Sequence, residues 1–329
     1  MKYLLRRLAF YFVAFWATIT LNFFLPRLMP GNPAEALLSK FGGRLNPLAL
    51  HAIAIAFGLH VHESWWRQYW QYLIQVIHGN LGTSLTFYPA PVLSVITAGL
   101  PWTLGLVGLS TVISFLLGIA VGAVSAWRHG GPFDTFMSTF FTFTYAFPYF
   151  WIALTFLYVV GYLWGAFPLS GAYTTGLMPT LSWAFVLNVV RHGILPAFTI
   201  IFTSLGYWAV NMRNTMIATL SEDYVIMAQA KGLTLRQILI SYAGRNAILP
   251  NITGFAMSLG FIVAGAILTE IVFSYPGIGY LLFQAVQQED YPLIQGILLM
   301  VAFAVLAANF LADITYSLLD PRVTIGESQ

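Results

Sequence analysis

The sequence predicts an all-α integral membrane protein with six transmembrane helices, cytoplasmic N and C termini, and a long external segment between helices one and two. Of its 329 residues, 59% are hydrophobic and 8% are charged, whereas an average soluble protein has about 25% charged residues. The mean hydropathy is +0.78. So few charges cannot give a large core a polar surface, which excludes a soluble enzyme, a nucleic-acid-binding protein and a disordered protein.

Six apolar stretches without Asp, Glu, Lys or Arg are long enough to cross a bilayer, whose ~30 Å hydrocarbon core needs about 20 residues of helix. We expect the first to be a retained span, because its apolar run is longer than that of a signal peptide. The third should be one tilted helix kinked at Pro148. A shorter piece, 177–190, is interpreted as an interfacial or re-entrant helix. The predicted spans are residues 8–25, 102–127, 135–164, 194–212, 252–269 and 293–312.

The positions of the cations predict the orientation, because cytoplasmic loops are enriched in Lys and Arg. The short connections on the opposite side hold only Arg191. Both termini and residues 213–245 are therefore predicted to be cytoplasmic, and residues 31–99 external. The cations on the cytoplasmic side are Lys2, Arg6, Arg7, Arg128, Arg213, Lys231, Arg236, Arg245 and Arg322.

The predicted spans divide the chain into three parts. Residues 1–29 hold the N-terminal tail and the first helix, residues 30–101 form the external segment, and residues 102–329 form a core membrane domain. Within this core, the cytoplasmic loop at about 213–245 is longer than a membrane hairpin needs.

The external segment carries an aromatic cluster that includes Trp65, Trp66 and Trp70. One interpretation is a folded cap that lies on the lipid headgroups. The other adds a docking surface for an external partner, formed by these three tryptophans.

The sequence contains no catalytic constellation. It has no cysteine, which excludes disulfides, cysteine-ligated zinc, iron–sulfur clusters and thiol catalysis. It has no G-x-x-x-x-G-K-[ST] motif, so the chain carries no recognisable phosphate-binding loop of its own. The spacing of His60, His62 and Glu63 is too weak to predict a metal site. Glu270 and Asp313 lie at the ends of predicted spans, and each is either a functional acid or a structural hydrogen-bonding group.

The internal segment contains a short predicted helix at 221–232 with both ends marked. Ser221 is a good N-cap, Glu222 and Asp223 lie in the first turn, Lys231 lies in the last turn, and Gly232 suits the C′ position. Exposed apolar residues in its middle must be covered by this protein or by another one.

A second helical stretch is predicted at 235–242, followed by Arg245, Asn246 and a break at Pro250. From composition alone, two interpretations of the internal segment stay open. It is either a hairpin that only connects two spans or a docking site for another protein.

Short motifs follow one another along nearly the whole chain: Met29-Pro30-Gly31-Asn32-Pro33, Gly79-Asn80-Leu81-Gly82, Asp223-Tyr224-Val225, Ala228-Gln229-Ala230-Lys231-Gly232-Leu233, Arg245-Asn246-Ala247, Phe273-Ser274-Tyr275-Pro276-Gly277, Asp290-Tyr291-Pro292 and Leu319-Asp320-Pro321-Arg322. Their order and spacing resemble the permeases of ABC importers for dipeptides, oligopeptides and nickel, in particular the B-type subunit. The chain departs from the family at Asn32 and Asn80, where the family has Asp, and at 226–228, where the general signature reads Glu-Ala-Ala.

The resemblance implies a transport subunit rather than an enzyme, in the cell membrane of a bacterium or archaeon. A second homologous permease would complete the pathway, and an external binding protein would deliver substrate. Two cytoplasmic ATPase subunits would bind ATP and Mg, so that this chain needs no cofactor. The residues implied to couple to an ATPase are Glu222, Asp223, Tyr224, Ala228, Ala230, Lys231, Gly232, Arg245 and Asn246.

The cargo stays open among di- or oligopeptides, nickel chelates and oligosaccharides. A transporter of another class, driven by an ion gradient, would need intramembrane ionisable relays or paired broken helices, and neither is evident in the sequence. Gly254, Gly260 and Gly265 in the fifth predicted span are expected to let helices approach closely.

Overall fold

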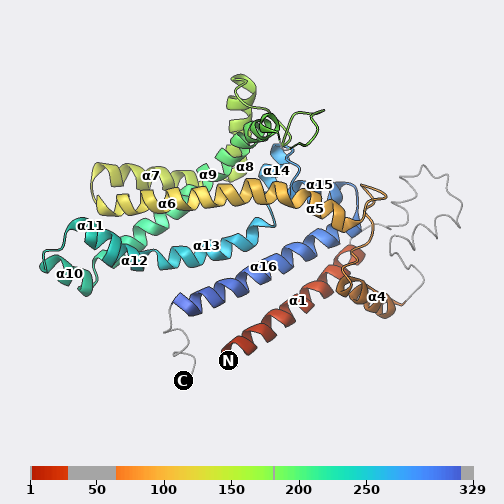
Figure 1. The fold of residues 1–329 in the computed structure, drawn as a ribbon, viewed down its shortest axis with the longest axis horizontal. Helices are drawn as coiled ribbons and strands as arrows, with labels where there is room; N and C mark the ends of the chain where they lie inside the picture. The colour runs from red at the N-terminus through yellow and green to blue at the C-terminus, as the bar shows by residue number, and fades with distance from the viewer. Residues whose placement is uncertain (1, 29–63, 181, 320–329) are drawn as a thin grey trace, which may run out of the picture. The chain divides into compact units, whose positions relative to one another are not determined.

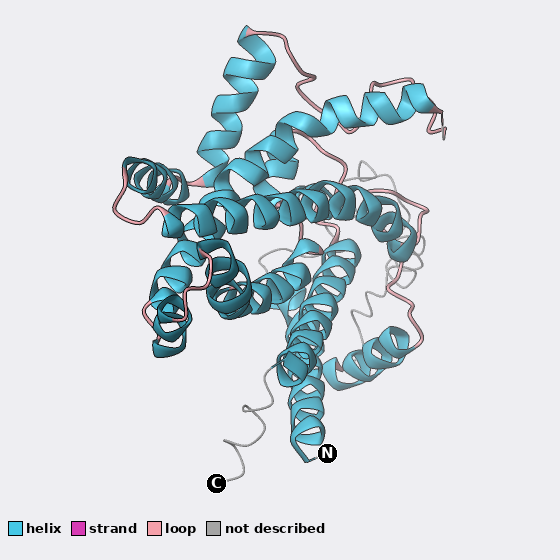
Figure 2. Ribbon diagram, turned by 60° about the vertical axis from the view of Figure 1, so that its left-hand side comes forward, coloured by secondary structure: helices cyan, strands magenta, loops and turns pink. Residues whose placement is uncertain are grey.

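The regular elements of the described chain are helices, as the sequence predicts (Figures 1 and 2). They belong to two compact units, one formed by residues 1–102 with 277–329 and the other by residues 103–276. The computed structural model describes residues 2–28, 64–180 and 182–319.

Helices α1 and α16 run side by side in the first unit (Figure 1). Asn22 Nδ2 donates to the carbonyl of Gln295 at 2.8 Å, and Gln295 Nε2 donates to the carbonyl of Asn22 at 3.0 Å. Arg7 and Tyr11 both donate to Asp313, which gives this acid a structural hydrogen-bonding role. The helices of the unit are α1 (Lys2–Leu28), α4 (Trp65–Ile77), α5 (Val92–Thr103, which ends at the unit boundary), α15 (Ile278–Gln287) and α16 (Tyr291–Leu319).

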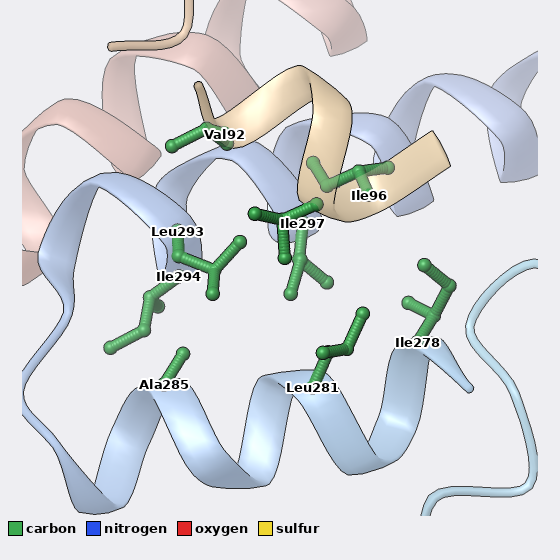
Figure 3. Packing of buried hydrophobic residues seen from close by; sticks show 9 residues of the cluster. Val92, Ile96, Ile278, Leu281, Ala285, Leu293, Ile294 and Ile297 are labelled. Atoms are coloured by element: carbon green, nitrogen blue, oxygen red, sulfur yellow. The ribbon is translucent and has the colours of Figure 1, made fainter. Parts of the chain in front are cut away.

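Apolar side chains of α5, α15 and α16 form the core of the first unit, and Figure 3 shows them pointing toward one another. Gly296 lies where α5 and α16 approach closely, because a Cβ at this position would be 2.4 Å from Val92 Cγ1. The buried core residues are Val92, Val95, Ile96, Ile278, Leu281, Ala285, Leu293, Ile294 and Ile297.

The start of α16 also holds part of the predicted external segment. Asp290 is fully buried and accepts hydrogen bonds from the backbone N–H of Thr86 at 2.8 Å and of Leu293 at 3.1 Å. The hydroxyl of Ser84 donates to the same carboxylate. Residues 84–86 are thereby fixed to the connection between α15 and α16.

The second unit is organised around α9, a continuous helix of 38 residues that is about 57 Å long at 1.5 Å per residue. The other elements pack along it or follow from its ends. They are the π-helical turns η1 (Leu104–Gly108), η2 (Leu157–Leu163) and η3 (Ile238–Ala243), and the helices α6 (Leu109–Trp127), α7 (Pro132–Ala146), α8 (Tyr149–Phe156), α9 (Trp183–Leu220), α10 (Asp223–Ala230), α11 (Leu235–Gln237), α12 (Gly244–Ala247), α13 (Leu249–Ile262) and α14 (Ile267–Val272).

Two glycines of α6 bring it close to α9. A Cβ on Gly118 would be 2.5 Å from Trp208 Cβ, and one on Gly122 would be 2.4 Å from the carbonyl oxygen of Ala209. A side chain cannot fit at either place, so these glycines let the two backbones approach. The close approach expected of Gly254 is weaker, because a Cβ there would meet Trp208 only at 3.6 Å.

The described part of the chain contains four helices long and apolar enough to cross a membrane, or five if one bent pair is a single span. The count of six spans and the orientation of the termini therefore stay predictions. The four helical segments are 7–24, 92–127, 183–220 and 291–311.

The prediction of one kinked helix over 135–164 was wrong. Helix α7 ends at Ala146, a new helix begins at Tyr149, and the two are bent by 94°. Proline has no N–H to donate and disfavours helical backbone in the residue before it. Phe147 accordingly has an extended conformation (φ −78°, ψ 138°) and Pro148 becomes the N-cap of α8.

Two further boundaries differ from prediction. The piece 177–190 is no separate interfacial helix, because α9 begins at Trp183 after the N-cap Ser182, whose Oγ accepts from the N–H of Phe185 at 3.3 Å. The fifth predicted span is interrupted at 263–266, where Gly265 has a positive φ of 75°. A Cβ on Gly265 would be 2.9 Å from Glu270 Oε1, so this glycine makes a turn against a buried carboxylate.

Candidate functional site

Helix α10 begins one residue later than the sequence predicts. Its N-cap is Glu222, whose backbone is extended, and Asp223 lies in its first turn. Ser221 instead ends α9, where its Oγ donates to the carbonyl of Ala218 at 2.7 Å. Serine often bonds a carbonyl three or four residues earlier in this way, which is why its presence alone did not fix the helix start.

The C-terminal end of α10 is closed by a Schellman motif. Gly232 occupies the C′ position with φ 73°, as predicted. Its N–H donates to the carbonyl of Gln229 at 2.9 Å, and the N–H of Leu233 donates to the carbonyl of Ala228 at 3.3 Å. This pair of bonds requires a left-handed residue at C′, which glycine adopts without strain.

Helix α10 rests on a buried apolar cluster through two residues, Val225 and Ala228. The opposite side of the helix faces outward, with Tyr224, Ile226 and Met227 exposed and Met227 at 59%. We call the residues beneath it the α10 seat; they are Ala126 of α6, Met212 and Met216 of α9, and Ile238, Leu239, Ala243 and Ala247 of the following stretch.

The stretch after α10 is helical from Leu235 to Ala247, which confirms the prediction at 235–242 and extends it. A capping box starts it, because Thr234 Oγ1 accepts from the N–H of Gln237 and Gln237 Oε1 accepts from the N–H of Thr234. Asn246 Nδ2 donates to the hydroxyl of Tyr224 at 2.7 Å. The two helices of the segment are therefore joined on their exposed side as well as through the seat.

The structure sorts the nine residues implied to couple to an ATPase. Ala228 is buried in contact with the seat. Tyr224 and Asn246 bond one another. The remaining six are exposed: Glu222, Asp223, Ala230, Lys231, Gly232 and Arg245. Their contact with an ATPase stays a prediction.

A buried ion pair that the sequence analysis missed lies close to the seat. Asp134, in the first turn of α7, is 2% exposed, and Arg213 of α9 donates to it through Nη2 at 2.7 Å and through Nε. The same carboxylate accepts from Ser125 Oγ at 2.7 Å and from the N–H of Gly130 at 3.0 Å, and it contacts His129 Nδ1 at 3.1 Å. One carboxylate thus joins the end of α6, the start of α7 and α9.

One sequence signal could have found this pair. Asp134 is the only acid between Glu63 and Glu222, and it stands one residue before a long apolar run. A lone acid in such a place needs a partner, because burial of an unpaired charge is costly. The partner itself is 79 positions away in the chain, and no local pattern indicates it.

A cleft of about 730 Å³ opens in the second unit. The middle of α9 lines it, and so do both chain interruptions, the one at Phe147 and Pro148 and the one at Gly265 and Ala266. None of the described residues that line it is charged. The lining instead carries aromatic rings and hydroxyl groups, among them Tyr145, Tyr149, Thr203, Ser204, Tyr207 and Ser258.

The sequence comparison decides the family. Residues 118–325 match the family described as binding-protein-dependent transport system inner membrane component, which is more than half of the chain. The chain belongs to this family. The resemblance to ABC importer permeases is thereby confirmed. Helix α10 and its seat lie within the matched residues, and so do the residues that line the cleft, except Val107 and Thr111.

Relatives of this inner membrane component are similar over their full length. The chain is 34% identical over 336 residues to the di/tripeptide transport system permease protein DppB of Pseudomonas aeruginosa, with 98% of each chain covered. It is 32% identical over 339 residues to the dipeptide transport system permease protein DppB of Escherichia coli, again with 98% of each covered. The oligopeptide transport system permease protein AppB of Bacillus subtilis is 30% identical over 323 residues, with 98% of each covered.

Two predicted features of this transport component belong to other parts of the chain. Trp65, Trp66 and Trp70 lie on α4 in the first unit, and all three are exposed; their docking role stays a prediction. The weak histidine pair, His60 and His62 with Glu63, lies outside the described residues, as do the motifs at 29–33 and 320–322.

Proposed function

We propose that this chain is the permease subunit of an ATP-driven importer, forming half of the translocation pathway for di- or oligopeptides delivered by an external binding protein. A second homologous permease forms the other half, and two cytoplasmic ATPase subunits bind ATP and Mg. The chain crosses the cell membrane of a bacterium or archaeon six times, with both termini in the cytoplasm. It has no catalytic residue and holds no cofactor itself.

One observation supports this proposal most: a single helix both lines the cleft and carries the α10 seat. Ile200, Thr203 and Tyr207 of α9 line the cleft, and Met212 and Met216, the next turns of the same helix, lie under α10. A push on the exposed side of α10 therefore acts on the helix that forms the cleft wall.

Two polar contacts support the same transmission. The Asp134–Arg213 pair fixes α9 to α7 at the level of the seat, because Arg213 stands between the seat residues Met212 and Met216. Ser125 of α6 donates to the same carboxylate. Asn251 of α13 is fully buried; it accepts from Asn211 Nδ2 at 3.1 Å and donates to the carbonyl of Ala247 at 3.2 Å. Closure of the ATPase pair would move α10 and its seat, and these contacts would carry α6, α7, α9 and α13 with it.

The character of the cleft favours peptides as cargo. Short peptides differ widely in side-chain charge, and a wall with fixed charges would hold some of them and repel others. A wall of aromatic rings and hydroxyl groups gives weak contacts to all of them, which suits passage rather than storage. The relatives' names also refer to di/tripeptide, dipeptide and oligopeptide transport.

Uptake by proteoliposomes tests the proposal. The chain would be reconstituted with its partner permease, its ATPases and its binding protein, and radiolabelled dipeptide would be offered with external binding protein and ATP at the ATPase side. We expect uptake that needs ATP and is lost with a hydrolysis-dead ATPase. Uptake driven by a proton or sodium gradient without ATP would overturn the proposal. Competition by a nickel chelate or an oligosaccharide, but not by peptides, would overturn the peptide cargo alone.

Thiol labelling tests the orientation, since the chain has no native cysteine. A cysteine introduced at position 60 should react with a membrane-impermeant reagent in intact cells. One introduced at position 235 should react only after the cells are opened. The reverse pattern would place α10 outside and exclude its contact with a cytoplasmic ATPase.

A further inference from the structure

Helix α4 has three distinct faces. Gln68, Tyr69, Tyr72 and Val76 are turned toward the rest of the first unit and are buried or half-buried. The second face is apolar and exposed, with Trp66 at 68% and Ile77 at 80%. It consists of Trp66, Trp70, Ile74 and Ile77, whose spacing of four, four and three residues places them in one stripe. The third face is polar and carries Arg67, Gln71 and Gln75.

The contacts of α4 fix its height relative to the first span. The hydroxyl groups of Tyr69 and Thr20 are 2.7 Å apart, and Asn22 Nδ2 donates to the hydroxyl of Tyr72 at 3.3 Å. The ring of Phe23, fully buried, lies 5.3 Å from that of Tyr69. Thr20, Asn22 and Phe23 belong to the last turn and a half of the apolar segment 7–24. Helix α4 is therefore attached where that segment reaches the edge of the hydrocarbon core.

At this height the surroundings of an exposed apolar stripe are the headgroup and upper acyl region. Tryptophan is enriched there, because its large ring is apolar while its N–H still needs a polar partner. Thirteen residues are too few to cross the bilayer. An amphipathic helix of this kind lies flat and buries its apolar face about 5–10 Å deep.

We propose that the stripe Trp66, Trp70, Ile74 and Ile77 is a lipid-contacting surface, on which α4 lies in the interface beside α1. The exposed polar side chains Arg67 and Gln75 then meet water. Because the helix has one cation and no acid, the contact depends on apolar area and not on anionic lipid. For Trp66 and Trp70 the sequence left open a cap on the lipid headgroups and a docking surface for an external partner, and the apolar stripe and its depth favour the bilayer.

Nitroxide accessibility tests this surface. Single cysteines would replace Trp70, Ile74 and Gln75, with Gln75 as the matched control on the same helix. The labelled permease would be studied with its partner subunits in nanodiscs of zwitterionic lipid. Oxygen concentrates in lipid and a nickel chelate stays in water, so their relaxation effects report depth. We expect an oxygen-to-nickel ratio several-fold higher at positions 70 and 74 than at 75, with no change when anionic lipid is added.

The other occupants give different results. Equal, nickel-dominated values at all three positions would overturn the proposal. A second result would also overturn it: labels at positions 70 and 74 are relaxed by the nickel chelate alone, and this relaxation falls when the binding protein is added. That result would establish a docking surface for the binding protein. Shielding of both positions from both reagents in the nanodisc would show that a partner permease covers the stripe. Two positions on the stripe are labelled, so that a result caused by one substitution that disturbs the helix can be recognised from the other position.

Discussion

Gly232→Val should disconnect α10 from the ATPases without disturbing the rest of the permease. Gly232 has φ 73°, and a Cβ at this position would meet nothing within 4 Å. The substitution therefore introduces backbone strain alone, with no steric clash. Valine would move out of the left-handed region, and the bonds from Gly232 and Leu233 to the last turn of α10 would be lost together.

The strain of an L-residue in this conformation is roughly 1–2 kcal/mol. This free energy lowers the equilibrium constant between the intact and the unwound end of α10 by a factor of about 5–30. Helix α10 has eight residues, and isolated helices that short are unstable, so it has little reserve against this change. The last turn, with Ala230 and Lys231, should unwind first, while Val225 stays in contact with the seat.

The assay measures two quantities in the reconstituted importer: co-purification of the ATPases, and peptide taken up per ATP hydrolysed. Gly165→Val is the matched control. Gly165 also follows the C-cap residue of a helical stretch, here Trp164, has φ 61°, and has open space around its Cβ position. It is far in sequence from α10. Gly232→Asn is the rescue variant, because asparagine tolerates the left-handed conformation.

We expect Gly232→Val to reduce ATPase association or coupling several-fold, Gly232→Asn to restore most of it, and Gly165→Val to leave it unchanged. Normal coupling in Gly232→Val would refute the reasoning, since the energy would then enter elsewhere. Equal losses in Gly232→Val and Gly165→Val would show that backbone strain anywhere destabilises the permease.

Three further changes test the surroundings of α10. Asp134→Asn should lower the free energy of unfolding of the purified permease by roughly 3 kcal/mol, because the charge of Arg213 is left without its partner. The double variant with Arg213→Met should lose less than the sum of the two single variants. Additive losses would contradict a direct pair. Gly122→Val should greatly reduce the yield of assembled complex, because its Cβ would lie 2.4 Å from a carbonyl oxygen of α9. Gly193→Val is the control and should assemble normally, because nothing lies within 4 Å of its Cβ position. Tyr224→Phe removes one exposed hydrogen bond, worth about 0.5–1.5 kcal/mol at most, so its coupling should stay closer to wild type than that of Gly232→Val; a larger loss would mean that the hydroxyl contacts the ATPase.

Local signals in the sequence were sufficient for the elements whose ends are chemically marked. The left-handed Gly232 and the helical stretch after Thr234 could be predicted because caps act within a few residues. The long apolar helices α1 and α16 could be predicted because their length alone sets them apart. The family motifs then located the segment around α10, although not which of its residues face inward.

The remaining features depend on contacts between distant residues. The interruption at 263–266 lies in an apolar run that looks uniform, and it is stabilised where Glu270 accepts a hydrogen bond from Thr103 Oγ1 at 2.9 Å, 167 positions away in the chain. The inward side of Ala228 depends on Met212 and Met216, which belong to another helix. Pro148 marked a bend correctly, but its angle depends on how α8 packs against α9.

The composition of the α10 seat has a consequence for how the permease can move. Alanines at 126, 243 and 247 present smooth, shallow surfaces with no side-chain torsions to reset. Met212 and Met216 are unbranched and flexible, and can refill space that a shifted neighbour leaves. The branched members of the seat, Ile238 and Leu239, both belong to the stretch that follows α10 in the chain. We therefore expect α10 to be able to shift by a small amount against α6 and α9 without opening a gap beneath it.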